Sequence, residues 1–187
     1  MKVKVGVSAR HVHLSLEDYK ELFGEDEFVN IKDLRQPGEF ASNKQVTIIG
    51  PKKKIERVRV LGPLRSYTQV EVSKTDTITL GITAPVRNSG ELSDASEIII
   101  TSEKSEIKRK AAIIATRHIH INAKDALELG VKNNDTTSVK VTTGKGGIMD
   151  QVYYKVNNNS AFEFHIDTDD ANAFMITNEM ELEIISK

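Results

Sequence analysis

The chain has 187 residues, 39% of them hydrophobic, with a net charge of −1 and a pI of about 6.5. This length permits one large domain or two small ones. Because the charge is balanced and only 5% of residues are aromatic, we expect no nucleic-acid partner, which would need a positive field or stacking platforms. Cysteine is absent, which excludes disulfides, cysteine-ligated zinc and a thiol nucleophile.

The N-terminal residues already alternate like a strand, in Met1-Lys2-Val3-Lys4-Val5. No signal-peptide pattern precedes this strand. No segment reaches the ~18 consecutive apolar residues that a membrane span needs. These features predict a cytoplasmic protein without a membrane partner.

The first half of the chain opens with a strand predicted over residues 2–14. Ser15, with Asp18 three residues later, is typical of a helix N-cap, and Gly24 is placed to end that helix. Pro37-Gly38 predicts a type II turn. Short strands are predicted over residues 45–49, 55–60, 69–72, 77–82 and 97–101. Gly62-Pro63 is predicted to end the second of these strands.

The second half repeats this plan, starting with a strand over residues 111–121. Asn122 replaces Ser15 as the predicted N-cap, and Gly130 ends the helix. The stretch Gly144-Lys145-Gly146-Gly147 predicts a hairpin turn, and Asp167 predicts the start of another short helix. The remaining strands are predicted over residues 136–143, 151–156, 161–166 and 181–185. Many short strands at regular spacing favour barrels or sandwiches with small helices as lids.

The motif His11-Val12-His13 returns as His118-Ile119-His120, in each case between a predicted strand and a predicted helix cap. In a strand, side chains at i and i+2 lie on one face, roughly 6.5–7 Å apart along the chain. Each motif therefore predicts two imidazoles above one point, with the apolar residue turned into a core. The repeat predicts an internal duplication and two similar domains.

Four of the five histidines lie in these two motifs, which indicates metal ligands. A third ligand is available on a later strand of each half, as Glu71 or His165. The residues thus allow one site with two histidines and a carboxylate and another with three histidines. Three protein ligands with an open position are typical of catalytic zinc.

Two other interpretations of these residues stay open. His11, His13 and Glu71 also match the two-histidine, one-carboxylate iron site of an oxygenase. A non-catalytic barrel that binds a metal or ligand is the other alternative.

Arg65 follows the Gly62-Pro63 turn and precedes Glu71 by six residues. An arginine beside a bound cation is favourable when an oxyanion bridges the two charges. The planar guanidinium binds phosphate with two parallel hydrogen bonds, so Arg65 is the candidate phosphate ligand.

With these motifs, the chain resembles the PduL-type phosphotransacylases, also called phosphate propanoyltransferases, over nearly its whole length. Asp170 stands where the family pattern has glutamate. The stretches that carry the resemblance are Ser8 to Leu14, Gln36-Pro37-Gly38, Gly62-Pro63-Leu64-Arg65, Gln69-Val70-Glu71, Arg87-Asn88-Ser89-Gly90, Arg117 to His120, His165 to Asp169 and Ala171-Asn172-Ala173.

The resemblance implies a mainly β fold of two β-barrels capped by short helices. Residues 10–115 would form the first barrel, and residues 1–9 with 116–187 the second. It also implies two zinc ions between the barrels. One ion would be held by Glu71, His118 and His120, and the other by His11, His13 and His165.

The implied reaction converts a short-chain acyl-CoA, either propanoyl-CoA or acetyl-CoA, and phosphate to acyl phosphate and coenzyme A, reversibly. Arg65 would bind the phosphate, and the enzyme would be a homodimer. The residues that the resemblance assigns to coenzyme A are Ser8, Lys32, Arg59, Leu61, His165 and Asn172.

Overall fold

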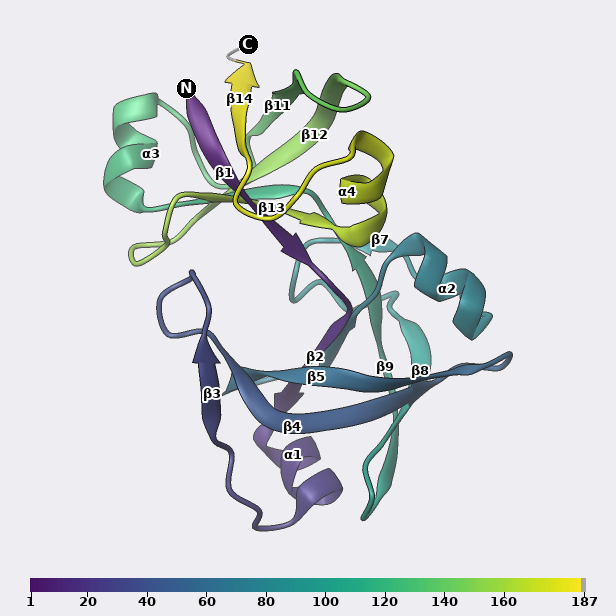
Figure 1. Cartoon of the computed structure of the whole chain (residues 1–187). Helices are drawn as coiled ribbons and strands as arrows, with labels where there is room; N and C mark the ends of the chain where they lie inside the picture. The colour runs from purple at the N-terminus through teal and green to yellow at the C-terminus, as the bar shows by residue number, and fades with distance from the viewer. Residues whose placement is uncertain (186–187) are drawn as a thin grey trace. The chain divides into compact units, whose positions relative to one another are not determined.

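The computed structural model describes residues 1–185, which form fourteen strands and four short helices. They divide into two compact units (Figure 1). One unit, the terminal barrel, contains Met1–Ala9 and the residues from Thr116 onward. The other, the central barrel, contains Arg10–Ala115. The chain therefore passes between the units twice, after Ala9 and after Ala115.

The terminal barrel is a closed sheet of six strands in the order β1-β13-β10-β12-β11-β14, with β14 pairing back onto β1. Its interior is apolar and includes Ile119 and Phe164. The strands are β1 (Lys2–Ser8), β10 (His118–Ile121), β11 (Thr136–Val141), β12 (Gly147–Val156), β13 (Glu163–Asp167) and β14 (Glu181–Ile185).

The central barrel also closes through six strands, in the order β4-β5-β2-β6-β9-β8, with β8 pairing back onto β4. Val12 and Val70 lie in its apolar core. These strands are β2 (His11–Ser15), β4 (Phe40–Ile49), β5 (Lys54–Arg65), β6 (Gln69–Glu71), β8 (Ser96–Thr101) and β9 (Glu106–Ala115). Two further strands, β3 (Asn30–Asp33) and β7 (Val86–Arg87), extend β4 and β9.

The two barrels share the same pairing scheme. In each, the His-x-His strand pairs parallel with one neighbour, β5 or β12, and antiparallel with the other, β6 or β13. The next strand around, β9 or β1, is parallel to β6 or β13. The remaining three pairings of each barrel are antiparallel. The prediction of two similar β-barrels is thus confirmed, and the shared scheme supports duplication.

The strand that precedes each His-x-His motif belongs to the barrel that does not contain the motif. β1 leads directly into β2 but pairs with β13 and β14 of the terminal barrel. β9 leads directly into β10 but pairs with β6 and β8 of the central barrel. The two repeats have therefore exchanged their first strands within one chain.

Each helix begins at a side-chain N-cap, which satisfies a free backbone N–H of the first turn. Ser15 Oγ accepts from Asp18 N at 3.1 Å, and Asn122 Oδ1 accepts from Asp125 N at 2.9 Å, as predicted. Asp167 Oδ1 accepts from Asp170 N at 2.8 Å. The helices are α1 (Leu16–Phe23), α2 (Lys74–Leu80), α3 (Ala123–Leu129) and α4 (Thr168–Phe174).

Four predicted features differ from the structure. The strand expected over residues 2–14 is interrupted between β1 and β2, and the one over 111–121 between β9 and β10, because the two parts belong to different units. Residues 77–82, predicted as a strand, lie largely in α2, where the capping box of Ser73 and Asp76 overrides the β-favouring threonines and isoleucine. β5 continues through Gly62-Pro63, which was predicted to break it.

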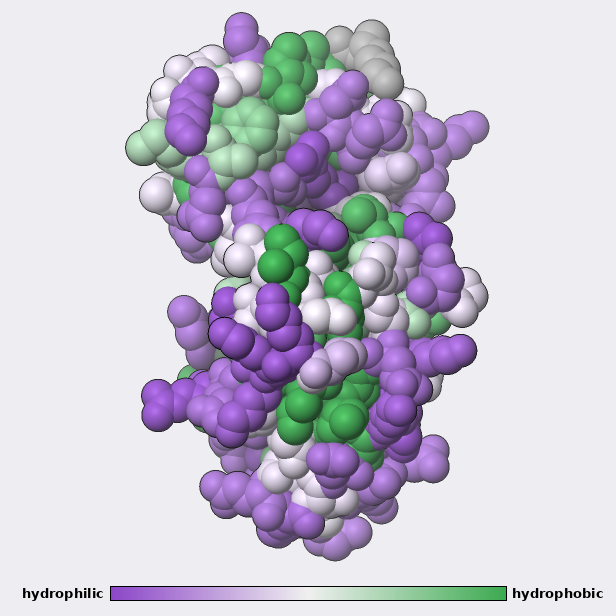
Figure 2. All heavy atoms as spheres, turned by 90° about the vertical axis from the view of Figure 1, so that its right-hand side faces the viewer, coloured by the Kyte–Doolittle hydropathy of each residue, from purple (hydrophilic) through white to green (hydrophobic). Residues whose placement is uncertain are grey.

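The surface carries charged residues mixed with hydrophobic ones. On the face in Figure 2, hydrophilic side chains lie between smaller groups of hydrophobic side chains. Within residues 1–185, no helix has both the length and the apolar character needed to cross a membrane.

Candidate metal centres and anion site

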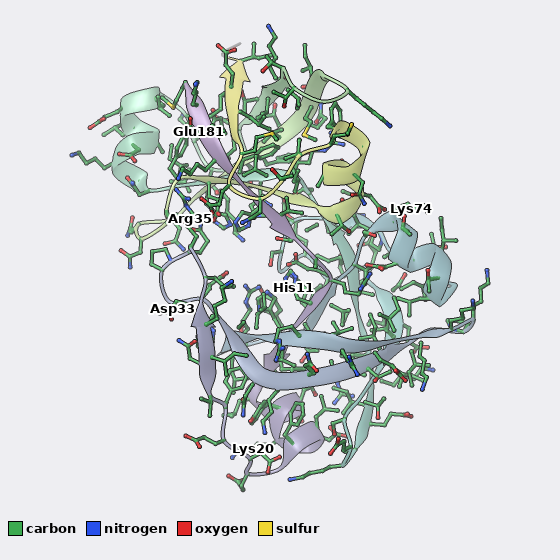
Figure 3. The ribbon with its side chains drawn as sticks, viewed as in Figure 1. His11, Lys20, Asp33, Arg35, Lys74 and Glu181 are labelled. Carbon is green, nitrogen blue, oxygen red and sulfur yellow. The ribbon has the colours of Figure 1, made fainter. Side chains whose placement is uncertain are left out.

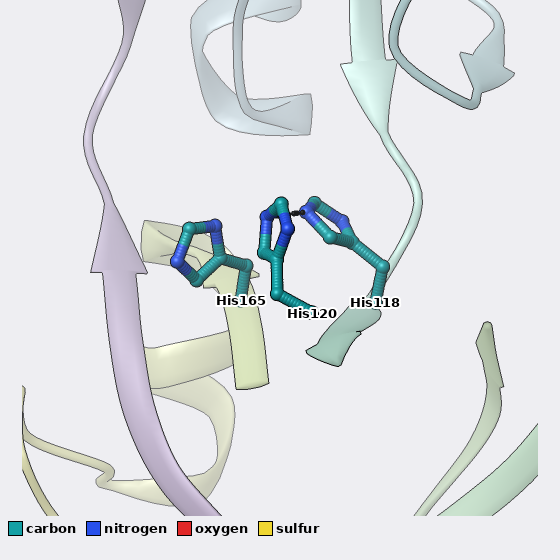
Figure 4. Close-up of side chains that lie close together, drawn as sticks. All are labelled: His118, His120 and His165. Carbon is teal, nitrogen blue, oxygen red and sulfur yellow. Dashed lines mark hydrogen bonds between the residues drawn. The ribbon is translucent and has the colours of Figure 1, made fainter. Parts of the chain in front are cut away.

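Three histidines of the terminal barrel come together on adjacent strands. His118 and His120 lie on β10, and His165 lies on β13 directly opposite His118. Because Ile119 and Phe164 alternate with them and enter the core, the histidines lie on the outer face of the barrel. Their rings face one another (Figure 4), with centroids 4.6–5.2 Å apart. One nitrogen from each ring lies within 4.8 Å of the others.

The contacts of His118 and His120 indicate one tautomer and a ring spacing that suit a metal ion. His118 Nδ1 lies 2.8 Å from the carbonyl oxygen of Thr116, which can only accept, so Nδ1 carries the proton. The Nε2 atoms of His118 and His120 lie 3.1 Å apart. Two nitrogens bound at about 2.0–2.1 Å to a tetrahedral zinc lie roughly 3.3 Å apart. The terminal-barrel cluster therefore fits a zinc ion.

The central barrel holds an equivalent cluster of His11, His13 and Glu71. His11, marked in Figure 3, begins β2 and lies opposite Glu71 of β6. His11 Nε2 is 3.4 Å from Glu71 Oε2, and one donor atom of each residue lies within 4.8 Å of the others. Two imidazoles and a carboxylate also fit zinc. Each unit thus brings together one of the two ligand sets that the residues allowed.

The ligand sets implied by the resemblance combine residues of both units, with Glu71 beside His118 and His120, and His165 beside His11 and His13. The geometry within one unit does not test them. This grouping stays a prediction.

Gln69 and Glu163 were missed in the sequence, although each lies next to the third ligand of its cluster. Gln69 Nε2 donates to Glu71 Oε1 at 2.6 Å, and Glu163 Oε2 lies 2.8 Å from His165 Nε2. Both side chains are buried. In the sequence, these two residues are distinguished only by lying two positions before Glu71 and His165. That spacing does not predict a functional contact until the strand register is known.

Arg65 ends β5 and lies in a polar environment within the central barrel. Its Nη1 donates to Ser89 Oγ at 3.1 Å and to Tyr67 OH at 3.3 Å. Its Nη2 donates to Glu39 Oε1 at 3.2 Å. Arginine has five N–H donors, so among residues 1–185 these contacts leave Nε and one Nη2 hydrogen to receive an oxyanion.

A chain of hydrogen bonds connects Arg65 to the central cluster. Ser89 Oγ accepts from Arg65 Nη1 and from Gln69 Nε2, the latter at 2.9 Å. Gln69 Nε2 also donates to Glu71 Oε1, and Gln69 Oε1 accepts from Gly90 N at 2.7 Å. The guanidinium of Arg65, the candidate phosphate ligand, and a candidate metal ligand are therefore held by the same short network.

Arg10 and Arg117 each lie just before a His-x-His motif. Each donates hydrogen bonds to an aspartate of the short helix, α2 or α4, that follows Glu71 or His165 in the chain. Arg10 Nε donates to Asp76 Oδ1 of α2 at 2.8 Å. Arg117 binds both carboxylate oxygens of Asp170 in α4, at 2.9 and 2.6 Å. This hydrogen bonding raises the pKa of Arg117 above its usual value. The matching arginines serve the local fold.

The residues that the resemblance assigns to coenzyme A are distributed over both units. In the central barrel, Leu61 pairs with His13 on one side and with Ala41 on the other, and Ala41 pairs with Lys32. Arg59 pairs with His11, and its Nη1 donates to the carbonyl oxygen of Ser42 at 2.9 Å. Ser8, at the end of β1, pairs with Asp167, and Asn172 lies on α4.

The fold and these clusters define a class: a duplicated double-barrel protein with a metal-ligand cluster on each barrel. A family model described as phosphate propanoyltransferase matches residues 4–177. The chain belongs to this family, which confirms the resemblance.

Several curated proteins named phosphate propanoyltransferase are similar to this chain. The protein from Thermotoga maritima is 51% identical over 175 residues, covering 92% of this chain and 83% of the relative. The protein from Rhodopseudomonas palustris is 45% identical over 188 residues, covering 100% and 83%. The protein from Salmonella typhimurium is 44% identical over 173 residues, covering 91% and 82%.

Proposed function

We propose that the protein is a phosphate acyltransferase that converts a short-chain acyl-CoA, such as propanoyl-CoA or acetyl-CoA, and phosphate to acyl phosphate and coenzyme A. Membership of the phosphate propanoyltransferase family supports this reaction. A phosphate oxygen bonds to the thioester carbonyl carbon, the carbon–sulfur bond breaks, and coenzyme A leaves as a thiolate. The reverse reaction uses the same groups, so the transfer is reversible.

The observation that carries this proposal is the network joining Arg65 to Glu71 through Ser89 and Gln69. An acyl transfer to phosphate must bring together an anionic nucleophile and an anionic thioester substrate. A fixed guanidinium beside a cation site lowers this repulsion and orients the phosphate, which is the proximity part of catalysis. Arg65 is the phosphate-binding residue in this proposal.

We propose two zinc ions as cofactors, held by His11, His13, Glu71, His118, His120 and His165. Their nitrogen and carboxylate donors support this choice. Zinc bound there would supply Lewis acidity toward a phosphate oxygen, the thioester carbonyl or the departing sulfur. The sequence contains no cysteine, so the acyl group is not carried on a thiol of this chain.

Coenzyme A is proposed to bind along Ser8, Lys32, Arg59, Leu61, His165 and Asn172. Support comes from a row of paired residues on the four neighbouring strands β2, β5, β4 and β3, which leads from His13 through Leu61 and Ala41 to Lys32. Lys32 is exposed at the end of this row, where a cation suits the phosphates of the nucleotide part.

The proposal is tested by thiol release from propanoyl-CoA and acetyl-CoA, with and without phosphate. Release that depends on phosphate, and that stops after treatment with a chelator and returns with Zn²⁺, is expected. Release that is independent of phosphate would contradict the proposal.

The oxygenase alternative has one specific observation in its favour, the two-histidine, one-carboxylate cluster of the central barrel. Elemental analysis of the purified protein separates the two, because the transferase is expected to contain zinc and the oxygenase iron. A non-catalytic binding barrel would release no thiol under any condition.

A homodimer in the cytoplasm is also proposed, on the resemblance and on the cysteine-free composition. Light scattering after size exclusion tests the dimer. Cell fractionation tests the location, and recovery with membranes or a large particle would contradict it.

A further inference from the structure

Glu163 lies beside His165, two residues earlier on β13 and opposite His120 on β10. Its side chain is only 5% exposed, and Oε2 lies 2.8 Å from Nε2 of His165. A carboxylate accepts this hydrogen bond, which places the proton of the imidazole on Nε2. The lone pair of His165 then lies on Nδ1, which is free to face a metal.

The central barrel has the matching pair in different chemical form. In the central barrel, Gln69 lies opposite His13 and Glu71 lies opposite His11. In the terminal barrel, Glu163 lies opposite His120 and His165 lies opposite His118, so Gln69 corresponds to Glu163 and Glu71 to His165. Where the third ligand is a carboxylate, its neighbour Gln69 is a donor. Where the third ligand is an imidazole that must donate, its neighbour Glu163 is an acceptor. Each pair therefore contains one carboxylate.

Gly6 provides the space that this pair needs. Gly6 of β1 lies opposite His165, and a Cβ at this position would lie 2.8 Å from Glu163 Oε1 and 2.8 Å from His165 Cδ2. The equivalent position in the central barrel, opposite Glu71, is Ile113. The glycine is therefore matched to the Glu163–His165 pair rather than to the barrel in general.

We propose that Glu163 is a positioning residue that fixes His165 with Nε2–H bound and Nδ1 presented to the metal. This proposal rests on the proposed function, in which His165 is a zinc ligand. A carboxylate that accepts the second N–H of a ligating histidine fixes both its ring orientation and its tautomer, and its loss lowers metal affinity by about 10–100-fold. The role holds whichever other histidines share the ion with His165.

The first experiment measures Zn²⁺ affinity by competition with a chelating dye for the wild type and for E163Q, E163L and H165A. H165A is expected to lose one of two bound ions. E163L, which has no acceptor, is expected to weaken one ion by about 10–100-fold, and E163Q, which retains an acceptor oxygen, by less. Thermal unfolding followed by circular dichroism checks that each variant is folded.

A spectroscopic readout separates positioning from a general loss of structure. In metal-free wild-type protein, ¹⁵N NMR of His165 is expected to show the proton on Nε2, and in E163L this preference is lost. A proton on Nδ1 in the wild type would overturn the proposal. So would a folded E163L with unchanged Zn²⁺ affinity.

The equivalent pair of the central barrel, Gln69 and Glu71, suggests a second substitution that should restore Zn²⁺ binding to the H165E variant. H165E alone places two carboxylates side by side, without the donor that Glu71 receives from Gln69. The double variant E163Q/H165E recreates the Gln-x-Glu arrangement and is expected to bind Zn²⁺ at least about 10-fold more tightly than H165E. Absence of this rescue would count against the proposal.

Failure of this proposal and failure of the proposed metal site give different results. If H165A loses an ion while E163L retains both with unchanged affinity, only the role of Glu163 is wrong. If H165A also retains both ions, His165 is no ligand, and the metal site fails together with this proposal.

Discussion

Gln69 and Glu163 occupy the same position in the two barrels, opposite His13 and His120 respectively. Duplication has retained the position and the contact with the residue two places later. The direction of the hydrogen bond is reversed between the two barrels. The amide of Gln69 donates to the carboxylate of Glu71, whereas the carboxylate of Glu163 accepts from the imidazole of His165. The two clusters are therefore related in architecture but differ in where the negative charge lies.

Replacing Gln69 with leucine should weaken metal binding at the proposed site of the central barrel and phosphate binding at Arg65. The variant removes the donor to Glu71 and Ser89 and the acceptor for Gly90 N. We expect Zn²⁺ affinity at one site to fall about 10-fold and the KM for phosphate to rise. Chelator competition and steady-state kinetics measure the two effects, and unchanged values for both would contradict the role of Gln69.

Replacing Arg65 with lysine should raise the KM for phosphate by about 10-fold or more, because lysine retains the charge but loses the two-pronged hydrogen bonding. The KM for acyl-CoA should change little. Arg57 lies on the same strand and is exposed, so R57K is the matched control with unchanged phosphate kinetics. Equal phosphate KM values for R65K and the wild type would show that Arg65 does not bind this substrate.

The double variant E71A/H118A tests how the six proposed ligands are divided between the two ions. Within each unit the donor atoms of three ligands lie within 4.8 Å, so Glu71 and His118 belong to different clusters. Each single variant should lose one of two zinc ions, and the double variant should lose both, as measured by elemental analysis. Loss of one ion from the double variant would contradict this grouping and favour the one implied by the resemblance.

Removing Arg117 should destabilise the terminal barrel by about 1–3 kcal/mol, because its guanidinium binds both oxygens of Asp170 and the carbonyl oxygen of Asp150. R10A is the matched variant in the central barrel and should have a smaller effect. The Arg10 side chain is 43% exposed and makes one hydrogen bond to Asp76. Urea unfolding followed by circular dichroism measures both, and a larger effect for R10A would contradict the comparison.

Local patterns in the sequence were sufficient to predict the helix caps and the placement of two histidines on one face of a strand. Ser15, Asn122 and Asp167 cap helices as predicted, since capping depends on residues within one turn. The paired histidines were recognisable because the two-residue period of a strand is also local.

Features that depend on distant strands were not predictable in the same way. The interruption at Ala9 and Arg10 arises because β1 pairs with strands more than 150 residues later. The contacts of Gln69 and Glu163 acquire meaning only through the register of β6 on β2 and of β13 on β10. No pattern within a short window encodes that register.

The most direct test of the proposed acyl transfer measures thiol release from propanoyl-CoA by the purified protein while phosphate is varied. The account predicts saturable dependence on phosphate, formation of one acyl phosphate per thiol released, and loss of both after the metal is removed. Thiol release at the same rate without phosphate, or with no acyl phosphate formed, would contradict it.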